Sequence, residues 1–300
     1  MRDWCRAHHV PPGVQSKLFS PLTRSISNLS IDEASCDPML VALGRILTDP
    51  VKTAGWIPWN GGSLLSRPAE KALKKAGVDL RLSSPVRSLR FDSGQWIATT
   101  REAPERFHRV IITVPPWAFN FVENTPETAA LLQLAKSVQS RQIVTIRSTC
   151  SGIRELPGPL LADSTEEAVW FAEPVHGEDT ILVEKVVSGL DTANRIDLET
   201  VKQKYMAELN HLFPEAKVCE TPKVIPYPKA TPALVPGMKR PLPRQKSGLY
   251  LAGDWCMTGL PATLEGAAVS GTAAAEALLE DTGNSHNTLR GEQPVSDEDR

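Results

Sequence analysis

Residues 249–280 read LYLAGDWCMTGLPATLEGAAVSGTAAAEALLE, an apolar run followed by a lone aspartate and then by a segment of small residues. The apolar run predicts a buried strand that ends at Ala252, and Gly253 gives the backbone freedom for a tight exit. Asp254 then stands at the carboxyl end of a sheet strand, where open α/β sheets bind ligands. Its carboxylate would accept hydrogen bonds from the hydroxyls of a sugar or ribityl chain and would repel a phosphate.

The segment that follows predicts a helix with one face that lacks bulk. Pro261 stands near its start, and the amides of a first helical turn form a positive end that suits an anion or an electron-rich ring edge. Such a face would admit a flat ligand, or it would serve a close helix–sheet contact that binds nothing. The aspartate favours the ligand, because a buried carboxylate without a partner is costly. The small residues recur at spacings of three and four: Thr263, Gly266, Ala267, Ser270, Gly271 and Ala274.

Composition narrows the class of protein. The 300 residues suffice for one large or two ordinary domains. Because 33 basic residues nearly cancel 35 acidic ones, no net field favours nucleic acid, and we expect no nucleic-acid partner. Five dispersed cysteines without a C-x-x-C pair indicate reduced thiols and a cytoplasmic protein. No apolar run approaches the roughly 18 residues of a membrane span, although peripheral membrane contact stays open.

Other stretches predict a mixed α/β fold. Residues 1–50 look helical, with a capping box from Ser30 to Glu33, and a further helix is expected from Pro68 to Gly77. The stretch 78–100 alternates as three short strands, and RVIITVPP at 109–116 has the pattern of a parallel strand that is buried on both faces. Three strands between 140 and 190 predict an antiparallel sheet, and 199–214 predicts an amphipathic helix.

The stretch GDWCMTGLPATLEGAAVSGTAAA at 253–275 resembles the C-terminal flavin-binding motif of the FAD-dependent amine oxidase and phytoene desaturase superfamily. Its form looks most like the squalene-associated desaturases, the hydroxysqualene dehydroxylases. The stretches 28–47, 61–89, 109–118 and 229–243 are similar to further segments of these proteins. The resemblance therefore covers residues 1 to about 280, and it implies FAD as cofactor.

The resemblance also implies how the chain is divided. Residues 1–75 would be a helical part of a substrate domain, and 76–122 would be strands of a Rossmann-like FAD domain. Residues 123–228 would carry the substrate domain with its antiparallel sheet, and 229–281 would supply the C-terminal FAD-binding strand and helix. The polar tail 282–300 has the composition of a disordered segment.

The resemblance assigns cofactor contacts by position. Val86 would contact the adenine through its backbone, and the next sheet strand would approach the pyrophosphate or ribose. Asp254 would hold the ribityl or pyrophosphate region, and amides at the helix start would face the pyrimidine edge of the flavin. No catalytic residue and no metal ligand is assigned. The full cofactor-binding set is Val86, Thr113, Val114, Pro115, Gly253, Asp254, Thr263, Leu264 and Gly266.

Members of this superfamily open with a strand and a G-x-G-x-x-G turn that holds the FAD pyrophosphate, and these 300 residues contain no such motif. Gly61 and Gly62 do not follow an apolar strand and cannot substitute. The turn would supply several charge-assisted hydrogen bonds of roughly 1.5 to 3 kcal/mol each, so we expect weak FAD binding or none without a partner. The chain is either one part of a split enzyme, whose FAD-binding N-terminal piece is a separate polypeptide, or a truncated product.

By this resemblance the chain is an FAD-dependent oxidoreductase, or a subunit of one. Its expected substrate is an isoprenoid lipid, a squalene- or carotenoid-type hydrocarbon, which would exchange hydride with the flavin. Two alternatives stay open. One is a binding or regulatory relative that has lost FAD. The other is a flavin amine oxidase, which would need an aromatic cage beside the flavin. This alternative is weaker, because the chain has only three tyrosines.

Overall fold

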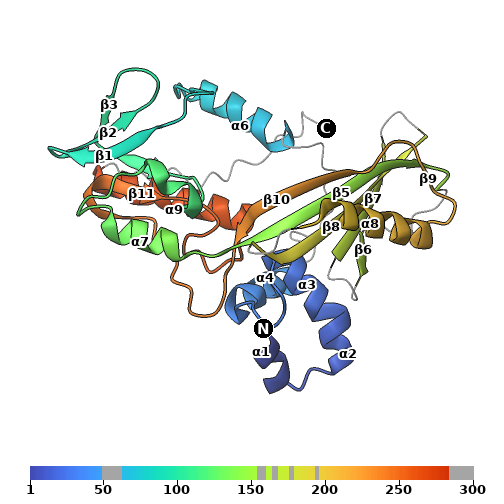
Figure 1. The fold of residues 1–300 in the computed structure, drawn as a ribbon. Coiled ribbons are helices and arrows are strands. Elements are labelled where there is room, and N and C mark those ends of the chain that lie inside the picture. The colour runs from blue at the N-terminus through green and yellow to red at the C-terminus, as the bar shows by residue number, and fades with distance from the viewer. Residues whose placement is uncertain (49–62, 154–159, 164–167, 176–178, 193–195, 284–300) are drawn as a thin grey trace, which may run out of the picture.

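The computed structural model describes residues 1–48, 63–153, 160–163, 168–175, 179–192 and 196–283. Figure 1 shows two sheet-containing halves side by side, with the N-terminal helices below them. The mixed helix and sheet architecture agrees with the predicted α/β class. The described helices include no membrane-spanning segment, because none combines the required length with sufficient hydropathy.

The first half is built on a two-stranded parallel sheet. Strand β11 (Leu249–Leu251) pairs with β4 (Val110–Ile112) in a register that sets Tyr250 opposite Ile111. The long helix α9 (Leu264–Asp281) covers one face of β11, where Tyr250 and Ala274 pack together. These pairings confirm the parallel strand and the strand–helix unit that the sequence predicts.

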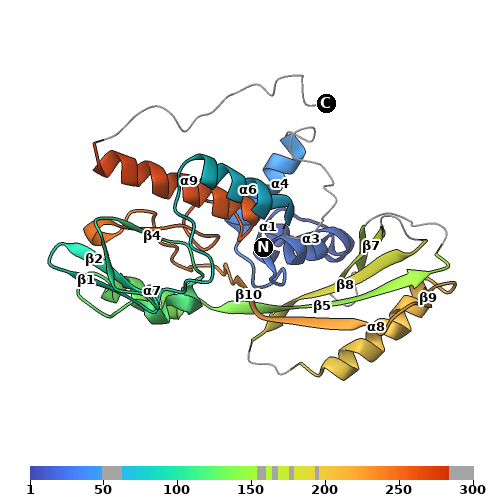
Figure 2. The same ribbon diagram turned by 90° about the horizontal axis from the view of Figure 1, so that it is seen from above.

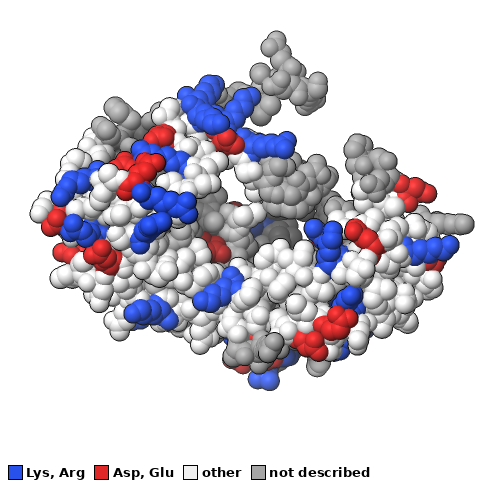
Figure 3. Space-filling model, turned by 45° about the horizontal axis from the view of Figure 1, so that its top comes forward, with Lys and Arg blue, Asp and Glu red and all other residues white. Residues whose placement is uncertain are grey.

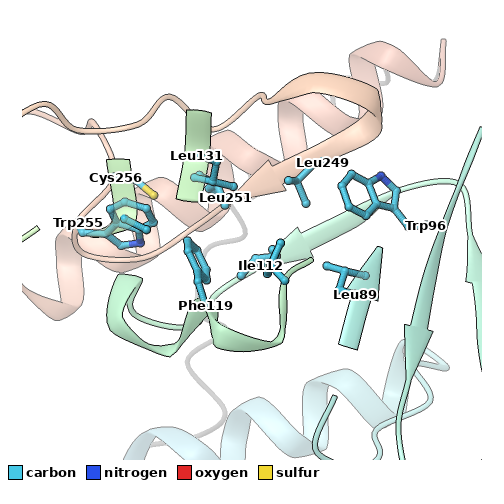
Figure 4. Close-up of a cluster of buried hydrophobic side chains, with 11 residues drawn as sticks. Leu89, Trp96, Ile112, Phe119, Leu131, Leu249, Leu251, Trp255 and Cys256 are labelled. Carbon is cyan, nitrogen blue, oxygen red and sulfur yellow. The ribbon is translucent and has the colours of Figure 1, made fainter. Parts of the chain in front are cut away.

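A large hydrophobic core fills the opposite face of this sheet. It lies against the 3-10 helix η2 (Pro116–Phe121), helix α7 (Ala129–Ser137) and an antiparallel sheet. That sheet has the order β1 (Ser88–Asp92), β2 (Gln95–Thr99) and β3 (Glu105–Phe107). Figure 4 shows Leu249 and Leu251 of β11 directed toward Ile112, Phe119 and Leu131. Helix α7 therefore packs with the strands of the first half, although it lies beyond residue 122.

The second half is a six-stranded antiparallel sheet among the described residues, and the sequence predicted three of its strands. Its order is β10-β5-β8-β7-β6, and β9 also pairs with β5. Helix α8 (Leu198–Leu212) packs on one face through Tyr205 and Leu209, and Figure 2 shows α3 on the opposite side. Asp197 caps α8 by accepting a hydrogen bond from the amide of Glu199. The strands are β5 (Ser140–Ser151), β6 (Leu160–Asp163), β7 (Ala168–Pro174), β8 (Ile181–Asp191), β9 (Lys217–Val218) and β10 (Lys223–Pro232).

The N-terminal part is helical, as predicted. It comprises α1 (Arg2–Ala7), α2 (Pro12–Val14), the π-helical turn η1 (Gln15–Phe19), α3 (Ser20–Ser27), α4 (Cys36–Thr48) and α6 (Ser63–Lys75). The Ser30 hydroxyl donates to the Glu33 carboxylate at 2.8 Å, but this pair closes a turn ahead of α4 instead of opening a helix. A short 3-10 helix, η3 (Lys246–Gly248), leads into β11.

Three sequence predictions are wrong. Residues 78–82 form no strand, and only the two later strands of the stretch 78–100 are present. Pro68 lies inside α6 and not at its start, although the helix does end in a turn at Gly77, which has φ of +73°. Strand β4 is not buried on both faces, because Ile111 is 39% exposed. Gly61, Gly62 and the tail after residue 283 lie outside the described residues.

Candidate functional site

A pocket of about 330 Å³ opens where β4 and β11 end. It is lined by the segment that leaves β4, by the turn that leaves β11 and by the start of α9. The arrangement follows from parallel pairing, since the carboxyl ends of parallel strands meet at one edge of a sheet. Seven of the nine residues predicted from the sequence line it: Thr113, Val114, Pro115, Gly253, Asp254, Thr263 and Leu264.

Gly253 makes the turn into this pocket. Its φ of +146° is one that other residues rarely adopt, and a Cβ added there would stand 3.1 Å from the Trp255 ring. The turn sends Trp255 into the core, where its ring meets Phe119 edge-on at 5.6 Å between centroids. It leaves Asp254, the residue between them, on the wall of the pocket.

Asp254 is a partly buried carboxylate. Burial raises the pKa of this carboxyl group above its ordinary value, while nearby backbone amides and the charge of Arg240 act in the opposite direction. Arg240 does not form an ion pair with it among the described residues, because the guanidinium points at backbone carbonyls. The carboxylate therefore remains available to accept hydrogen bonds from a ligand.

Arg240 holds the loop that carries Asp254, and sequence analysis did not single it out. Its Nη2 lies 3.0 Å from the carbonyl oxygen of Asp254, and its Nη1 lies 2.7 Å from that of Leu260. Its Nε lies 3.4 Å from the carbonyl oxygen of Trp255. One guanidinium thus bridges both ends of the loop 254–260, within a proline-rich stretch whose sequence gives no pattern for this role.

The start of α9 closes the pocket. Thr263 caps the helix, since its hydroxyl accepts a hydrogen bond from the amide of Gly266 at 3.2 Å. Ser270, one turn further on, binds both backbone groups of Gly253: its Oγ lies 2.7 Å from the amide nitrogen and 2.9 Å from the carbonyl oxygen. The small face of the helix therefore makes a close helix–strand contact, and its first turn borders the pocket.

The remaining two predicted residues lie apart from this pocket. Gly266 is buried, and a Cβ there would stand 2.7 Å from the Pro261 carbonyl oxygen, so packing accounts for this glycine. Val86 lines a second, larger hollow of about 540 Å³. Thr113 and Val114 line both hollows, so the two adjoin just past the end of β4. An extended ligand could therefore run from Asp254 past Thr113 toward Val86.

Other candidate groups are accounted for by packing or exposure. Burial raises the pKa of the Cys256 thiol to about 12, which removes its nucleophilic character. Lys229 is exposed on β10, and His8 stacks on Trp4 at 4.3 Å. No group of three His, Cys, Asp or Glu side chains suited to a metal ion occurs among the residues that the structure describes.

Comparison with known proteins identifies the family. The sequence model for flavin containing amine oxidoreductases matches residues 44–279. The chain belongs to this family. FAD is the cofactor that the family implies, as the sequence motif at 253–275 predicts.

Curated relatives include plant and cyanobacterial desaturases. The chain is 24% identical to the 15-cis-phytoene desaturase of Solanum lycopersicum, covering 94% of this chain and 52% of that protein. It is 23% identical to the 15-cis-phytoene desaturase of Synechococcus elongatus, covering 92% and 64%. The chain thus spans about half the length of the tomato relative.

Solved structures share the fold at low identity. An oxidoreductase from Methanosarcina mazei matches with a TM-score of 0.74 and 14% identity, over 92% of this chain and 67% of that one. Cyclohexylamine oxidase from Brevibacterium oxydans matches with a TM-score of 0.68 and 13% identity, over 94% and 67%.

The residues of the pocket fit part of an FAD molecule. Asp254 offers a carboxylate to hydroxyl groups, and Gly253 adds no side chain that would narrow the pocket. The first-turn amides of Leu264 and Glu265 have no protein acceptor among the described residues, so they can donate to the polar edge of a ring. These groups therefore suit the hydroxyl groups and the polar ring edge of FAD, and none of them requires a phosphate.

Proposed function

We propose that this protein works as an FAD-dependent oxidoreductase, or as one part of such an enzyme, on a long isoprenoid hydrocarbon. The convergence of Asp254, the β4 exit and the start of α9 on one pocket supports cofactor binding there. The similarity to 15-cis-phytoene desaturases supports a carotenoid-type substrate over an amine. A squalene-type hydrocarbon is the second candidate substrate within the isoprenoid class.

The chain's own residues would orient the cofactor. Bound FAD would supply the redox chemistry, by exchanging a hydride with a substrate carbon. Asp254 would fix the ribityl or ribose hydroxyls, and Arg240 would keep the loop of Asp254 in place through its carbonyl contacts. The α9 amides would face the ring edge, where a helix N-terminus favours electron-rich atoms.

A hydrocarbon substrate also bears on location. Such a substrate has no polar group and dissolves in the acyl region of a bilayer. We propose that the protein contacts a membrane surface to collect it, without spanning the membrane. Vesicle flotation of the purified protein, with and without 15-cis-phytoene in the vesicles, tests this contact directly.

FAD titration tests the proposed binding site. Quenching of FAD fluorescence is measured for the wild type, for Asp254→Ala and for the control Asp3→Ala, whose side chain is 97% exposed on α1. The proposal expects Asp254→Ala to weaken binding by about tenfold or more, which corresponds to roughly 1.4 kcal/mol, and expects no change in the control. Measurable FAD binding of equal affinity in all three proteins would remove Asp254 from the site.

Anaerobic reduction tests the substrate class. The FAD-loaded protein is mixed with 15-cis-phytoene, with squalene or with cyclohexylamine, and the visible flavin band is followed. Bleaching by an isoprenoid and not by the amine supports the proposal. Bleaching by the amine alone would instead assign an amine oxidase.

A further inference from the structure

Residues 8–18, here called the tip, join α1 to α3 and expose apolar side chains. Figure 1 shows α1 and α2 at the lower end of the molecule, below both sheets. Val14 and Leu18 lie about one helical turn apart and are 38% and 50% exposed. Pro11 and Pro12 beside them are exposed as well. The tip therefore presents a small apolar surface at one end of the molecule.

The tip is a formed structure and not a loose loop. The backbone amides of Val14 and Gln15 lie 2.9 and 3.0 Å from the carbonyl oxygen of Pro11. The buried side-chain amide of Gln15 donates to the carbonyl of Val10 at 2.7 Å. Pro11 and Pro12 have no N–H group at all. Because few backbone donors remain unpaired, the tip can leave water at a low cost in free energy.

The apolar side chains around the tip divide into an inner and an outer set. The rings of Trp4 and Phe19 lie 6.0 Å apart between centroids, and both pack against the N-terminal core that contains Leu29. Val14 and Leu18 are the exposed members. The inner set holds the tip together, so folding alone does not explain the outer set.

The charge of this region has one sign. Residues 4–31 contain no Asp or Glu, although 35 of the 300 residues of the chain are acidic. Lys17 and Arg6 are exposed there, and the neighbouring Asp3 lies 3.6 Å from Arg6 in an exposed pair that water screens. Figure 3 shows, by contrast, acidic and basic side chains interspersed over both halves of the molecule. A basic surface with apolar side chains suits an anionic lipid surface.

One unbroken helical stretch joins the tip to the antiparallel sheet. Elements α2, η1 and α3 follow one another directly over residues 12–27. Near the far end, the Arg24 guanidinium donates to the carbonyl of Ser188 on β8 at 2.8 Å. The Asn28 side-chain amide then donates to the hydroxyl of Thr231 on β10 at 2.9 Å. A surface bound by the tip would therefore be held in a fixed position relative to this sheet.

We propose that the tip enters the surface of an anionic lipid bilayer. Val14 and Leu18 would lie among the upper acyl chains, and Lys17 would lie at the level of the phosphate groups. Each basic residue at such a surface strengthens binding by roughly fivefold. The inference rests on the proposed function, because a hydrocarbon substrate is dissolved in the acyl chains, and it names the part of the chain that makes the membrane contact.

A protein partner suits the tip less well. A specific protein interface takes about 20–30 residues from each side, more than residues 8–18 supply. In a two-fold dimer of this chain the same surface would meet itself, so that Lys17 and Arg6 would face like charges. A bilayer needs only a few apolar side chains flanked by basic ones.

Co-sedimentation with vesicles tests the proposal. The purified protein should bind vesicles that contain phosphatidylglycerol, and binding should fall with phosphatidylcholine alone or at high salt. Leu18→Asp should weaken partitioning by about tenfold or more, because a carboxylate would enter the acyl region. The matched control is Leu212→Asp, which should bind as the wild type does. Leu212 is 41% exposed on α8, across the antiparallel sheet from α3.

Two further pairs of variants separate the charge from the insertion. Lys17→Glu should weaken binding to anionic vesicles by about fivefold or more, whereas Lys204→Glu, at an exposed position of α8, should weaken it less. Leu18→Trp should add fluorescence that lipids with brominated acyl chains quench, and Leu212→Trp should add fluorescence that they do not quench. Thermal unfolding of each variant separates lost binding from lost folding, and the Leu18→Trp result decides the matter should Leu18→Asp not fold.

Several outcomes would overturn the proposal. They are equal vesicle binding by the wild type and Leu18→Asp, no vesicle binding by the wild type, and dissociation of a dimer by Leu18→Asp in the absence of lipid. Bleaching of bound FAD by an isoprenoid is recorded separately. Bleaching together with vesicle binding that ignores Leu18→Asp would contradict the role of the tip alone. Vesicle binding that depends on the tip, without bleaching by any isoprenoid, would contradict the proposed function alone.

Discussion

Alanine at Gly266 should destabilise the protein, whereas alanine at Gly271 of the same helix should stabilise it. A Cβ at Gly266 would stand 2.7 Å from the carbonyl oxygen of Pro261, and that oxygen belongs to backbone which must then shift. A Cβ at Gly271 would meet nothing within 4 Å. Both positions lie inside α9 and both have ordinary helical φ, so the two substitutions differ mainly in this contact.

The magnitudes separate the two variants clearly. Replacing glycine by alanine inside a helix stabilises by roughly 0.5–1 kcal/mol, and this gain applies to both positions. Forcing an extra carbon into a packed site costs typically about 1–3 kcal/mol, and this cost applies only to Gly266. The difference between the two free energies of unfolding should therefore be about 1–3 kcal/mol.

Urea unfolding followed by far-UV circular dichroism measures this difference. The denaturant slope should be unchanged in both variants, so that a shift in midpoint reports stability. Gly266→Ala should also weaken FAD binding, because the displaced Pro261 precedes the capping residue Thr263 at the pocket. Equal midpoints for the two variants would refute the packing argument.

Three further outcomes are expected. Burial raises the pKa of the Asp254 carboxyl group, so protonation of this group favours the folded state. The free energy of unfolding of the wild type should therefore rise relative to that of Asp254→Asn as the pH falls toward the ordinary Asp pKa of 3.8. A difference between the two proteins that does not change with pH would contradict this. Arg240→Lys loses the fork that reaches three carbonyls and should cost about 2 kcal/mol or more, whereas the exposed Lys239→Ala should change stability by less than about 0.5 kcal/mol in the same urea assay. Cys219 is exposed and should react with Ellman's reagent in the native protein, while the Cys256 thiol, with its pKa raised to about 12, should react only after unfolding.

Local pattern predicted the parts of the fold that depend on neighbours within this chain. The apolar runs before Thr113 and Gly253 predicted parallel strands, and parallel pairing brings their carboxyl ends together at one pocket. The amphipathic spacing of Tyr205 and Leu209 likewise predicted a helix, and its apolar face packs on the antiparallel sheet. In each case the partner surface lies elsewhere in the same sequence.

Sequence reasoning failed where the deciding contact was not local. Residues 78–82 have strand alternation, but a strand forms only where another strand supplies its hydrogen bonds. Arg240 was missed because its role depends on the approach of a proline-rich segment to the loop 254–260, which no spacing in the sequence reveals. The close approach of the Pro261 carbonyl oxygen to Gly266 also gave no signal in the sequence, and the cofactor contact of Gly266 stays a prediction.

The two contacts between the Ser270 hydroxyl and the backbone of Gly253 limit which residues position 270 can accept. Cysteine and alanine match serine in size, yet neither restores a hydroxyl that serves the amide and the carbonyl of one residue at 2.7 and 2.9 Å. Threonine keeps the hydroxyl but adds a methyl group where the side chain is 0% exposed. A saturation library at position 270 should therefore return serine almost exclusively, and variants that lose it would release the turn bearing Asp254 while leaving the distant antiparallel sheet intact.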